Sequence, residues 1–213
     1  GAYPGGDRGT GLGHAGKGGE MTGRERFLTA LRGGQPDRVP LFDFLFQKPM
    51  YAELIGRTPD GYNGKDAVAC AVALAHDGVW VPFGGFNGFT PTYLDENTYV
   101  DEWGTTFRKE DASWPIDAPV GYPIKTRSDL AGFKVPDPTL PGRDGEIRNA
   151  VEANHTGLAI LGGVAGPFCQ TWMLMGYENI CYAMCEDPGL LTELFALSNE
   201  YNKEAARRSA AAG

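Results

Sequence analysis

GLAILGGV, residues 157–164, is the stretch that decides the expected fold of this 213-residue sequence. The run is apolar on both of its alternating faces and too short for a buried helix, which is typical of a strand covered on both sides in a parallel sheet. The turn AGPF, residues 165–168, follows directly, and a helical pattern begins after it. A strand that leads through a turn into a helix is the repeating unit of an α/β fold.

Two earlier runs have the same apolar character. RVPLFDFLF, residues 38–46, and VWVPF, residues 79–83, are predicted as buried strands. The Ala-rich run 65–76 lies between them and predicts a helix that ends at Asp77 and Gly78. The sequence therefore predicts three buried strands, with a helix that returns the chain from the first to a parallel second strand.

Further helical segments complete the predicted pattern. Residues 23–31, with Thr22 as the cap, predict a short amphipathic helix that lies on the surface. Helices are also predicted near residues 145–154, around 169–185 and over 188–212, the last with Asp187 as its N-cap. A strand would be expected to follow this last helix, and the sequence given ends before one.

Residues 98–109 show a different pattern, in which aromatic and branched residues alternate with polar ones around a turn at Gly104. This pattern is typical of an antiparallel β-hairpin rather than of a strand–helix unit. The stretch from Ser113 to Gly145 is rich in proline and glycine, and such a long irregular segment usually wraps a domain or lines a site. We therefore expect a hairpin insertion between the second and third strands.

The number of predicted strands favours part of a barrel. A (β/α)₈ barrel takes about 250 residues, so we expect an α/β fold that is the N-terminal part of a TIM barrel, truncated before the fourth barrel strand. A complete doubly wound fold is the alternative. It would be expected to show a Gly-rich phosphate turn after its first strand, and FLFQK, residues 44–48, contains no glycine.

Composition excludes several classes of function. The chain has 27 acidic and 19 basic residues, a net charge of −8, and no cluster of Lys and Arg beyond a pair, which argues against a nucleic-acid partner. No apolar run reaches the roughly 18–20 residues of a membrane span. The four cysteines are irregularly spaced and are expected to be reduced thiols. We expect a soluble cytoplasmic protein.

The two ends of the sequence differ in character. Residues 1–20 contain nine glycines and no apolar segment, which excludes a signal peptide and predicts a disordered leader or tag. Residues 21–213 are expected to form the barrel portion. Because the strand near residues 158–161 is apolar on both faces and would lack one neighbour, we expect its unpaired edge to permit self-association.

Several motifs together resemble the uroporphyrinogen decarboxylase superfamily (URO-D domain). They are RERFLTAL with PDRVP at residues 24–40, DEWGTTFRK at 101–109, GPF at 166–168 and GYEN at 176–179. The match runs in order from Met21 to Gly213. The superfamily also contains methyltransferases that act on corrinoid cofactors or thiols. The resemblance implies a (β/α)₈ barrel whose site lies at the carboxyl ends of the strands.

Three departures favour the methyltransferase branch over porphyrinogen decarboxylation. A porphyrinogen carries eight carboxylates and calls for arginine after the first strand, yet QKPMY, residues 47–51, has none. The aspartate that true decarboxylases carry after the second strand is missing from VPFGG, residues 81–85, and their tyrosine falls near Met173. Uroporphyrinogen decarboxylase and an inactive small-molecule-binding barrel remain the alternatives.

The methyltransferase branch implies a cofactor set. By resemblance, such enzymes bind zinc through one His and two Cys, hold a thiol as the thiolate and exchange a methyl group between it and a corrinoid. The family's zinc ligands lie in the second half of the barrel. We therefore expect zinc and a corrinoid for the full-length parent and no bound metal for this chain alone, with a small-molecule substrate or a corrinoid protein as partner.

Five residues are candidates for the site. Asp43 is the one charge in the first predicted strand and is a candidate catalytic group, the alternative being a carboxylate that accepts loop amides. Phe83, Phe86, Phe168 and Trp172 fall at or just beyond strand ends and are candidates to line an apolar substrate pocket, the alternative being packing at the barrel top. We expect Asp43, Phe168 and Trp172 to border one cavity.

Other candidates are interpreted as structural. Cys181 and Cys185 share a helical face and have the spacing to reach one metal, but their neighbours predict core packing instead. His76 and His155 lack partners at ligand spacing. The Gly-rich stretch 83–88 has no residue at P-loop spacing and is expected to be a mobile loop rather than a phosphate cradle.

Overall fold

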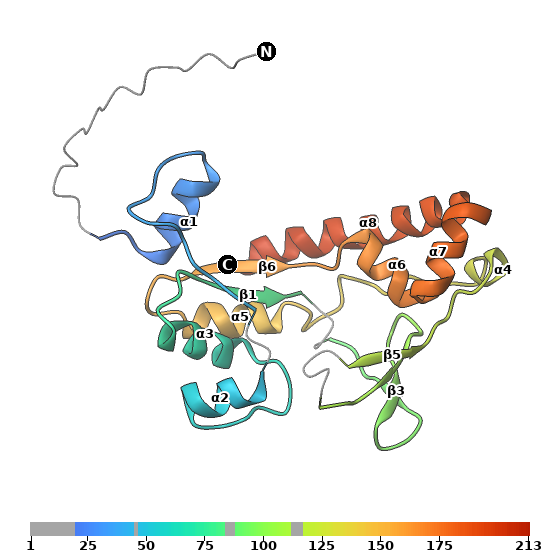
Figure 1. The fold of residues 1–213 in the computed structure, drawn as a ribbon, viewed down its shortest axis with the longest axis horizontal. Helices are drawn as coiled ribbons and strands as arrows, with labels where there is room; N and C mark the ends of the chain where they lie inside the picture. The colour runs from blue at the N-terminus through green and yellow to red at the C-terminus, as the bar shows by residue number, and fades with distance from the viewer. Residues whose placement is uncertain (1–19, 45–46, 84–87, 112–116) are drawn as a thin grey trace, which may run out of the picture.

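A computed structural model describes residues 20–44, 47–83, 88–111 and 117–213 and shows a mixed α/β fold with two sheets (Figure 1). The first sheet pairs β1 (Gly78–Pro82) in parallel with β6 (Ala159–Gly163), with Gly78 opposite Ala159. Both strands correspond to predicted buried runs. The parallel relation between strands about 80 residues apart confirms the α/β class.

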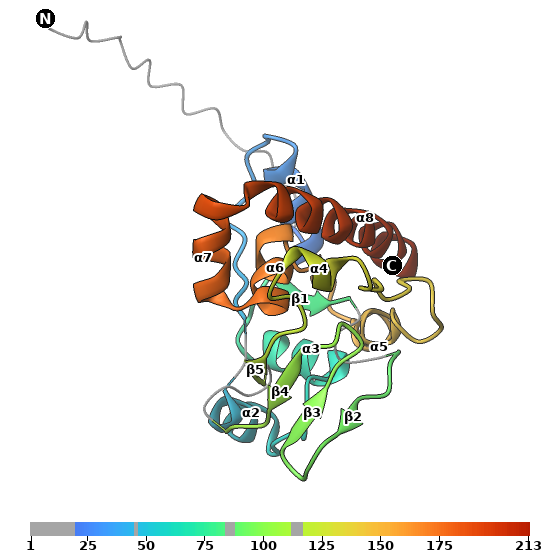
Figure 2. The ribbon, with the colours of Figure 1, turned by 90° about the vertical axis from the view of Figure 1, so that its right-hand side faces the viewer.

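Helices cover both sides of this parallel pair. α3 (Gly64–Ala73) and α5 (Gly145–Ala153) lie on one side and α8 (Pro188–Ala212) on the other (Figures 1 and 2). Small side chains allow the close approach, because Ala71, Ala150 and Ala205 are all at most 1% exposed. They pack with buried residues of both strands into the central core, whose apolar contacts supply most of the stabilisation.

The second sheet is antiparallel and extends the predicted hairpin. Its order is β2 (Thr92–Tyr93), β3 (Thr98–Val100), β4 (Thr106–Arg108) and β5 (Ala118–Gly121). The predicted turn at Gly104 is confirmed by a φ of 80° there, which favours glycine. Part of the segment predicted as irregular therefore forms strand, because β5 completes the hydrogen bonding of β4.

The remaining helices flank these sheets. Figure 1 shows α6 and α7 beyond the carboxyl end of β6, on the same end as the antiparallel sheet, and α1 at the opposite end. Their bounds are α1 (Gly23–Leu31), α2 (Lys48–Ile55), α4 (Arg127–Leu130), α6 (Pro167–Met175) and α7 (Tyr177–Glu186). α2 and α4 were not predicted.

Two of the predicted elements differ from the structure. The single helix expected around 169–185 is two helices, because Gly176 has a φ of 82° and ends α6. The run 38–46 is not a strand over its described part, residues 38–44. The backbone of Leu41 instead binds the residue before β1: its N–H donates to the Asp77 carboxylate at 2.8 Å and its carbonyl accepts from the Asp77 N–H at 2.7 Å.

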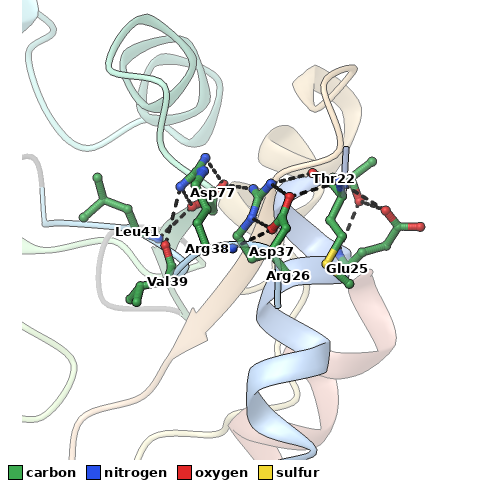
Figure 3. A network of polar contacts seen from close by, with 9 residues as sticks. Thr22, Glu25, Arg26, Asp37, Arg38, Val39, Leu41 and Asp77 are labelled. Atoms are coloured by element: carbon green, nitrogen blue, oxygen red, sulfur yellow. Dashed lines mark hydrogen bonds and ion pairs between the residues drawn. The ribbon is translucent and has the colours of Figure 1, made fainter. Parts of the chain in front are cut away.

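A network of charges joins α1 and the following loop to the start of β1 (Figure 3). Asp77 is 2% exposed and accepts from Arg26, from Arg38 at 2.6 Å and from the Leu41 N–H. Arg26 also donates to Asp37 at 2.5 Å. Burial acts to raise the pKa of Asp77, but these hydrogen bonds and the guanidinium charges outweigh it and lower the pKa below its ordinary value.

The two strands of the parallel sheet have no further strand partner among the described residues. Self-association through such an edge stays a prediction. Within the same residues, no helix is both long enough and apolar enough to cross a membrane.

Candidate functional site

A cavity of about 960 Å³ lies at the carboxyl ends of the two parallel strands. Pro82 and Phe83 line it from the end of β1, and Gly163 lines it from the end of β6. Cys169 and Met173 of α6 also line it. The antiparallel sheet supplies another part of the wall, so the two sheets meet at this cavity.

Three aromatic rings form a row across the antiparallel sheet and line the cavity. Tyr93 of β2 is opposite Tyr99 of β3, which is opposite Phe107 of β4. The ring centroids are 5.7 Å apart at both steps, and Tyr99 and Phe107 are stacked. Residues paired across neighbouring strands project from the same face of a sheet, so the register itself places these three rings, the aromatic row, together.

Two carboxylates accompany the aromatic row. Asp101 accepts from the N–H groups of Trp103 at 2.9 Å and Thr105 at 2.8 Å, and Asp117 accepts from the Tyr99 hydroxyl at 2.9 Å. Both line the cavity. Burial raises the pKa of Asp101 to about 6, against the amide hydrogen bonds, which lower it. Burial and the nearby Asp117 charge raise the pKa of Tyr99.

The charge of the cavity is negative. Among its described lining residues, carboxylates outnumber ammonium groups by five to two. These residues are Asp60, Asp101, Glu110, Asp111 and Asp117, with Lys48 and Lys109. The Lys48 ammonium pairs with Asp111 at 2.6 Å, and Lys109 donates to the Tyr93 hydroxyl at 2.9 Å.

Trp80 and Gly163 form a tight contact where the strands end. A Cβ added to Gly163 would overlap the indole Nε1 of Trp80, so only glycine fits beside this ring. The indole also meets Phe44 and Tyr62, at centroid distances of 5.0 and 6.1 Å. Trp80, Phe44 and Gly163 all line the cavity, so this contact fixes an aromatic surface at its base.

The structure brings only part of the expected site to the cavity. Phe83 lines it, but Phe168 does not, being 46% exposed and packed against Tyr177 at 6.4 Å. Trp172 packs instead against the core between α6, α7 and α8. Both lie on faces of α6 other than the one that carries Cys169 and Met173. Phe86 falls outside the described residues.

Asp43 lies beside the large cavity rather than in it. Its side chain is exposed, accepts from the Phe44 N–H at 2.7 Å and borders a separate small cavity of about 10 Å³. Phe44 and Trp80 line both cavities. The expectation that Asp43, Phe168 and Trp172 share one cavity is therefore not met, because the run containing Asp43 leaves β1 and α6 turns the two rings away.

The cysteines and histidines form no metal site in the described parts of the chain, where no three His, Cys, Asp or Glu side chains are placed to hold an ion. Cys181 and Cys185 are exposed, so the prediction that they pack in the core is wrong. The buried face of α7 carries Ile180 and Ala183 instead. His155 is exposed, and His76 ends the turn after α3.

Comparison with known proteins supports the fold. A methyltransferase from Methanosarcina mazei is similar in structure, with a TM-score of 0.68 and 20% sequence identity. The alignment covers 91% of this chain and 57% of that one, so the sequence spans little more than half the length of that protein. No protein-family model matches the chain, and no curated protein matches it in sequence.

Proposed function

We propose that this chain is the amino-terminal part of a (β/α)₈-barrel methyltransferase of the uroporphyrinogen decarboxylase superfamily. The observation that carries the proposal is the cavity of about 960 Å³ at the carboxyl ends of the parallel pair β1 and β6. Barrel enzymes keep their sites at this end. The fold similarity to a protein described as a methyltransferase adds support.

The lining of the cavity argues against a porphyrinogen substrate. No arginine lines it among the described residues, and the carboxylates there outnumber the lysines. A substrate with many carboxylates would meet like charges in a partly buried site, which costs binding free energy. The residue expected near the decarboxylase tyrosine, Met173, does line the cavity but offers only a thioether.

Zinc and a corrinoid belong to the proposal through the resemblance. The described residues of this chain do not fit zinc, because they contain no cluster of three ligands. What this chain supplies is the binding surface: the aromatic row and Trp80 exclude water and contact apolar groups, and Asp101 and Asp117 set the sign of the charge.

We assign Asp43 an orienting role at the rim of the site. Its neighbour Phe44 lies between the small cavity and the large one, so the carboxylate is one residue from the cavity wall. Exposure keeps it available to a bound substrate. Phe83 contributes to the pocket wall itself, being 7% exposed and at the cavity.

Methyl transfer by the full-length natural protein tests the proposal. The protein is incubated with methylcobalamin and a small thiol, with added zinc or after chelation. We expect the absorbance of the cobalt–carbon bond to fall and the methyl thioether to form, and both signals to disappear on chelation. Asp43→Asn is expected to slow transfer by about 10²-fold, whereas Glu53→Gln, an exposed change on α2, leaves it unaltered.

Two results would contradict the proposal. Release of carbon dioxide from a porphyrinogen would identify a decarboxylase. Binding of small molecules without turnover of any methyl donor would identify an inactive barrel.

A further inference from the structure

We propose that the cavity binds an alkylammonium cation, held against the aromatic row with Asp101 and Asp117 as its counter-charges. A quaternary or methylated ammonium group combines a positive charge with an apolar surface. It therefore needs aromatic faces and negative charge in the same place. The cavity supplies both, from the antiparallel sheet and the residues that flank it.

The aromatic component is preorganised. Tyr99 and Phe107 are fixed by strand register and stack at 5.7 Å, so their rings lose little freedom when a ligand binds. Trp103 lines the same cavity and is held by an edge contact with Tyr201 at 4.9 Å. No lysine or arginine of the described chain lies over Tyr99 or Phe107, and both residues line the cavity.

The charge component is uncompensated within the described residues. Neither Asp101 nor Asp117 forms an ion pair there; they accept instead from backbone N–H groups and from the Tyr99 hydroxyl. The nearest charged neighbour along the chain, Glu102, is already paired with Arg143. Asp111 is paired with Lys48. A cation that enters the cavity thus meets two carboxylates without a cationic partner.

The chain itself places a cation at one end of the row. The ammonium group of Lys109 lies over the Tyr93 ring, 4.5 Å from its centroid, while donating to the Tyr93 hydroxyl. Tyr99 and Phe107 present further aromatic rings to the same cavity. An alkylammonium ligand would place its charge against the Tyr99 ring as the Lys109 ammonium does on Tyr93, without the hydrogen bond to a hydroxyl.

This inference names a ligand class for the site and rests on the proposed function only for treating that ligand as a substrate. Binding and methyl transfer are therefore measured separately. Binding is followed by calorimetry without any corrinoid, so that a failure of either idea leaves the other standing.

The probe is choline, compared with the neutral alcohol in which carbon replaces the choline nitrogen and with acetate. The two alcohols have the same shape, so their difference reports the charge alone. We expect saturable heat for choline, binding at least about tenfold weaker for the neutral alcohol, and none for acetate. This comparison uses the unmodified chain and does not depend on how any variant folds.

Matched variants locate the site. Asp117→Asn and Tyr99→Leu are expected to weaken choline binding by about fivefold or more. Tyr99→Phe keeps the ring, loses only the hydrogen bond to Asp117 and is expected to retain binding. Tyr177→Leu removes an exposed ring outside the cavity and is expected to change nothing.

Equal affinity for choline and its neutral counterpart would overturn the proposal, as would a preference for acetate. Retention of full choline affinity by Asp117→Asn and Tyr99→Leu together would place the cation elsewhere and overturn it as well.

Discussion

The aspartates at the two ends of the parallel strand pair differ in their ion pairing. At the amino end, Asp77 meets Arg26 and Arg38, and Asp37 meets Arg26. At the carboxyl end, Asp101 and Asp117 line a cavity without an ion-pair partner among the described residues. The pKa of Asp77 is lowered, whereas that of Asp101 is raised to about 6.

This difference indicates that the charges at the amino end have a structural role and those at the carboxyl end a functional one. Paired charges at the amino end tie α1 and the following loop to the start of β1, which is a structural task. Unpaired charges at the carboxyl end cost stability, because a partly buried carboxylate loses hydration. Groups with perturbed pKa values that lie in a cavity are candidates for function.

The largest expected effect is at the amino end. Asp77→Ala leaves Arg26 buried without one of its carboxylate partners and removes the acceptor of the Leu41 N–H. We expect a loss of about 3–5 kcal/mol in the free energy of unfolding, measured by urea denaturation. Glu53→Ala, an exposed change on α2, serves as control with an effect within about 0.5 kcal/mol. Equal losses of unfolding free energy in the two variants would show that the network has no structural role.

The ion pair between Arg143 and Glu102 extends the comparison of the two ends, because it is a paired charge near the cavity. Arg143 is 2% exposed and makes a two-pronged pair with Glu102, the residue after Asp101. Arg143→Met is expected to cost about 2–3 kcal/mol of unfolding free energy, since Glu102 keeps some exposure. A double-mutant cycle with Glu102→Gln isolates the pair, and a coupling energy near zero would show that the pair does not hold the antiparallel sheet in place.

The next effect is steric. Gly163→Ala forces the Trp80 indole to move and is expected to cost about 1–3 kcal/mol and to shift the fluorescence of this residue. Gly166→Ala is the matched control, because a Cβ there meets nothing within 4 Å. If both variants have the same unfolding free energy, the contact between Trp80 and Gly163 does not fix the base of the cavity.

The smallest effect is on pH dependence. The folded-state pKa of Asp101, about 6, lies above its ordinary value of 3.8, so the folded state binds more protons between these values. This group therefore contributes a loss of stability as pH rises from about 4 to 6. Glu102, Tyr99 and the amides of Trp103 and Thr105 act on it from nearby.

Asp101→Asn should remove that contribution, so the variant gains stability relative to the natural chain as pH rises through this window. Unfolding curves at several pH values measure the difference. Asp77, with its lowered pKa, has the opposite sign: its contribution is lost only as pH falls through its folded-state pKa. If the difference in unfolding free energy between Asp101→Asn and the natural chain does not change with pH, the burial of Asp101 is contradicted.

Local patterns in the sequence were sufficient to predict much of the fold. The apolar run 157–164 contains β6, and alternation over 98–109 predicts β3 and β4. The strand predicted over 38–46 is absent from its described part, residues 38–44, where the apolar residues meet other rings, such as Phe42 with Phe27 at 5.8 Å, without pairing to a strand. Apolar composition reports burial or ring contact and does not by itself specify strand pairing.

The site was only partly predictable. Phe83 follows a predicted strand and lines the cavity, but the aromatic row was not predicted as part of a site. The alternating pattern shows that Tyr99 and Phe107 are in strands, not which face of the sheet meets the cavity. That depends on contacts distant in sequence, such as the Thr105 hydroxyl donating to the Met173 carbonyl 68 residues away.

Nuclear magnetic resonance of the tryptophan indoles during a choline titration tests the central claim most directly. Trp80 and Trp103 line the cavity, whereas Trp172 packs against the same core cluster as Trp103 but does not line the cavity. The account predicts saturable shifts of the Trp80 and Trp103 indole signals, with that of Trp172 unmoved. A shift confined to Trp172, or none at Trp80 and Trp103 under saturating choline, would contradict it.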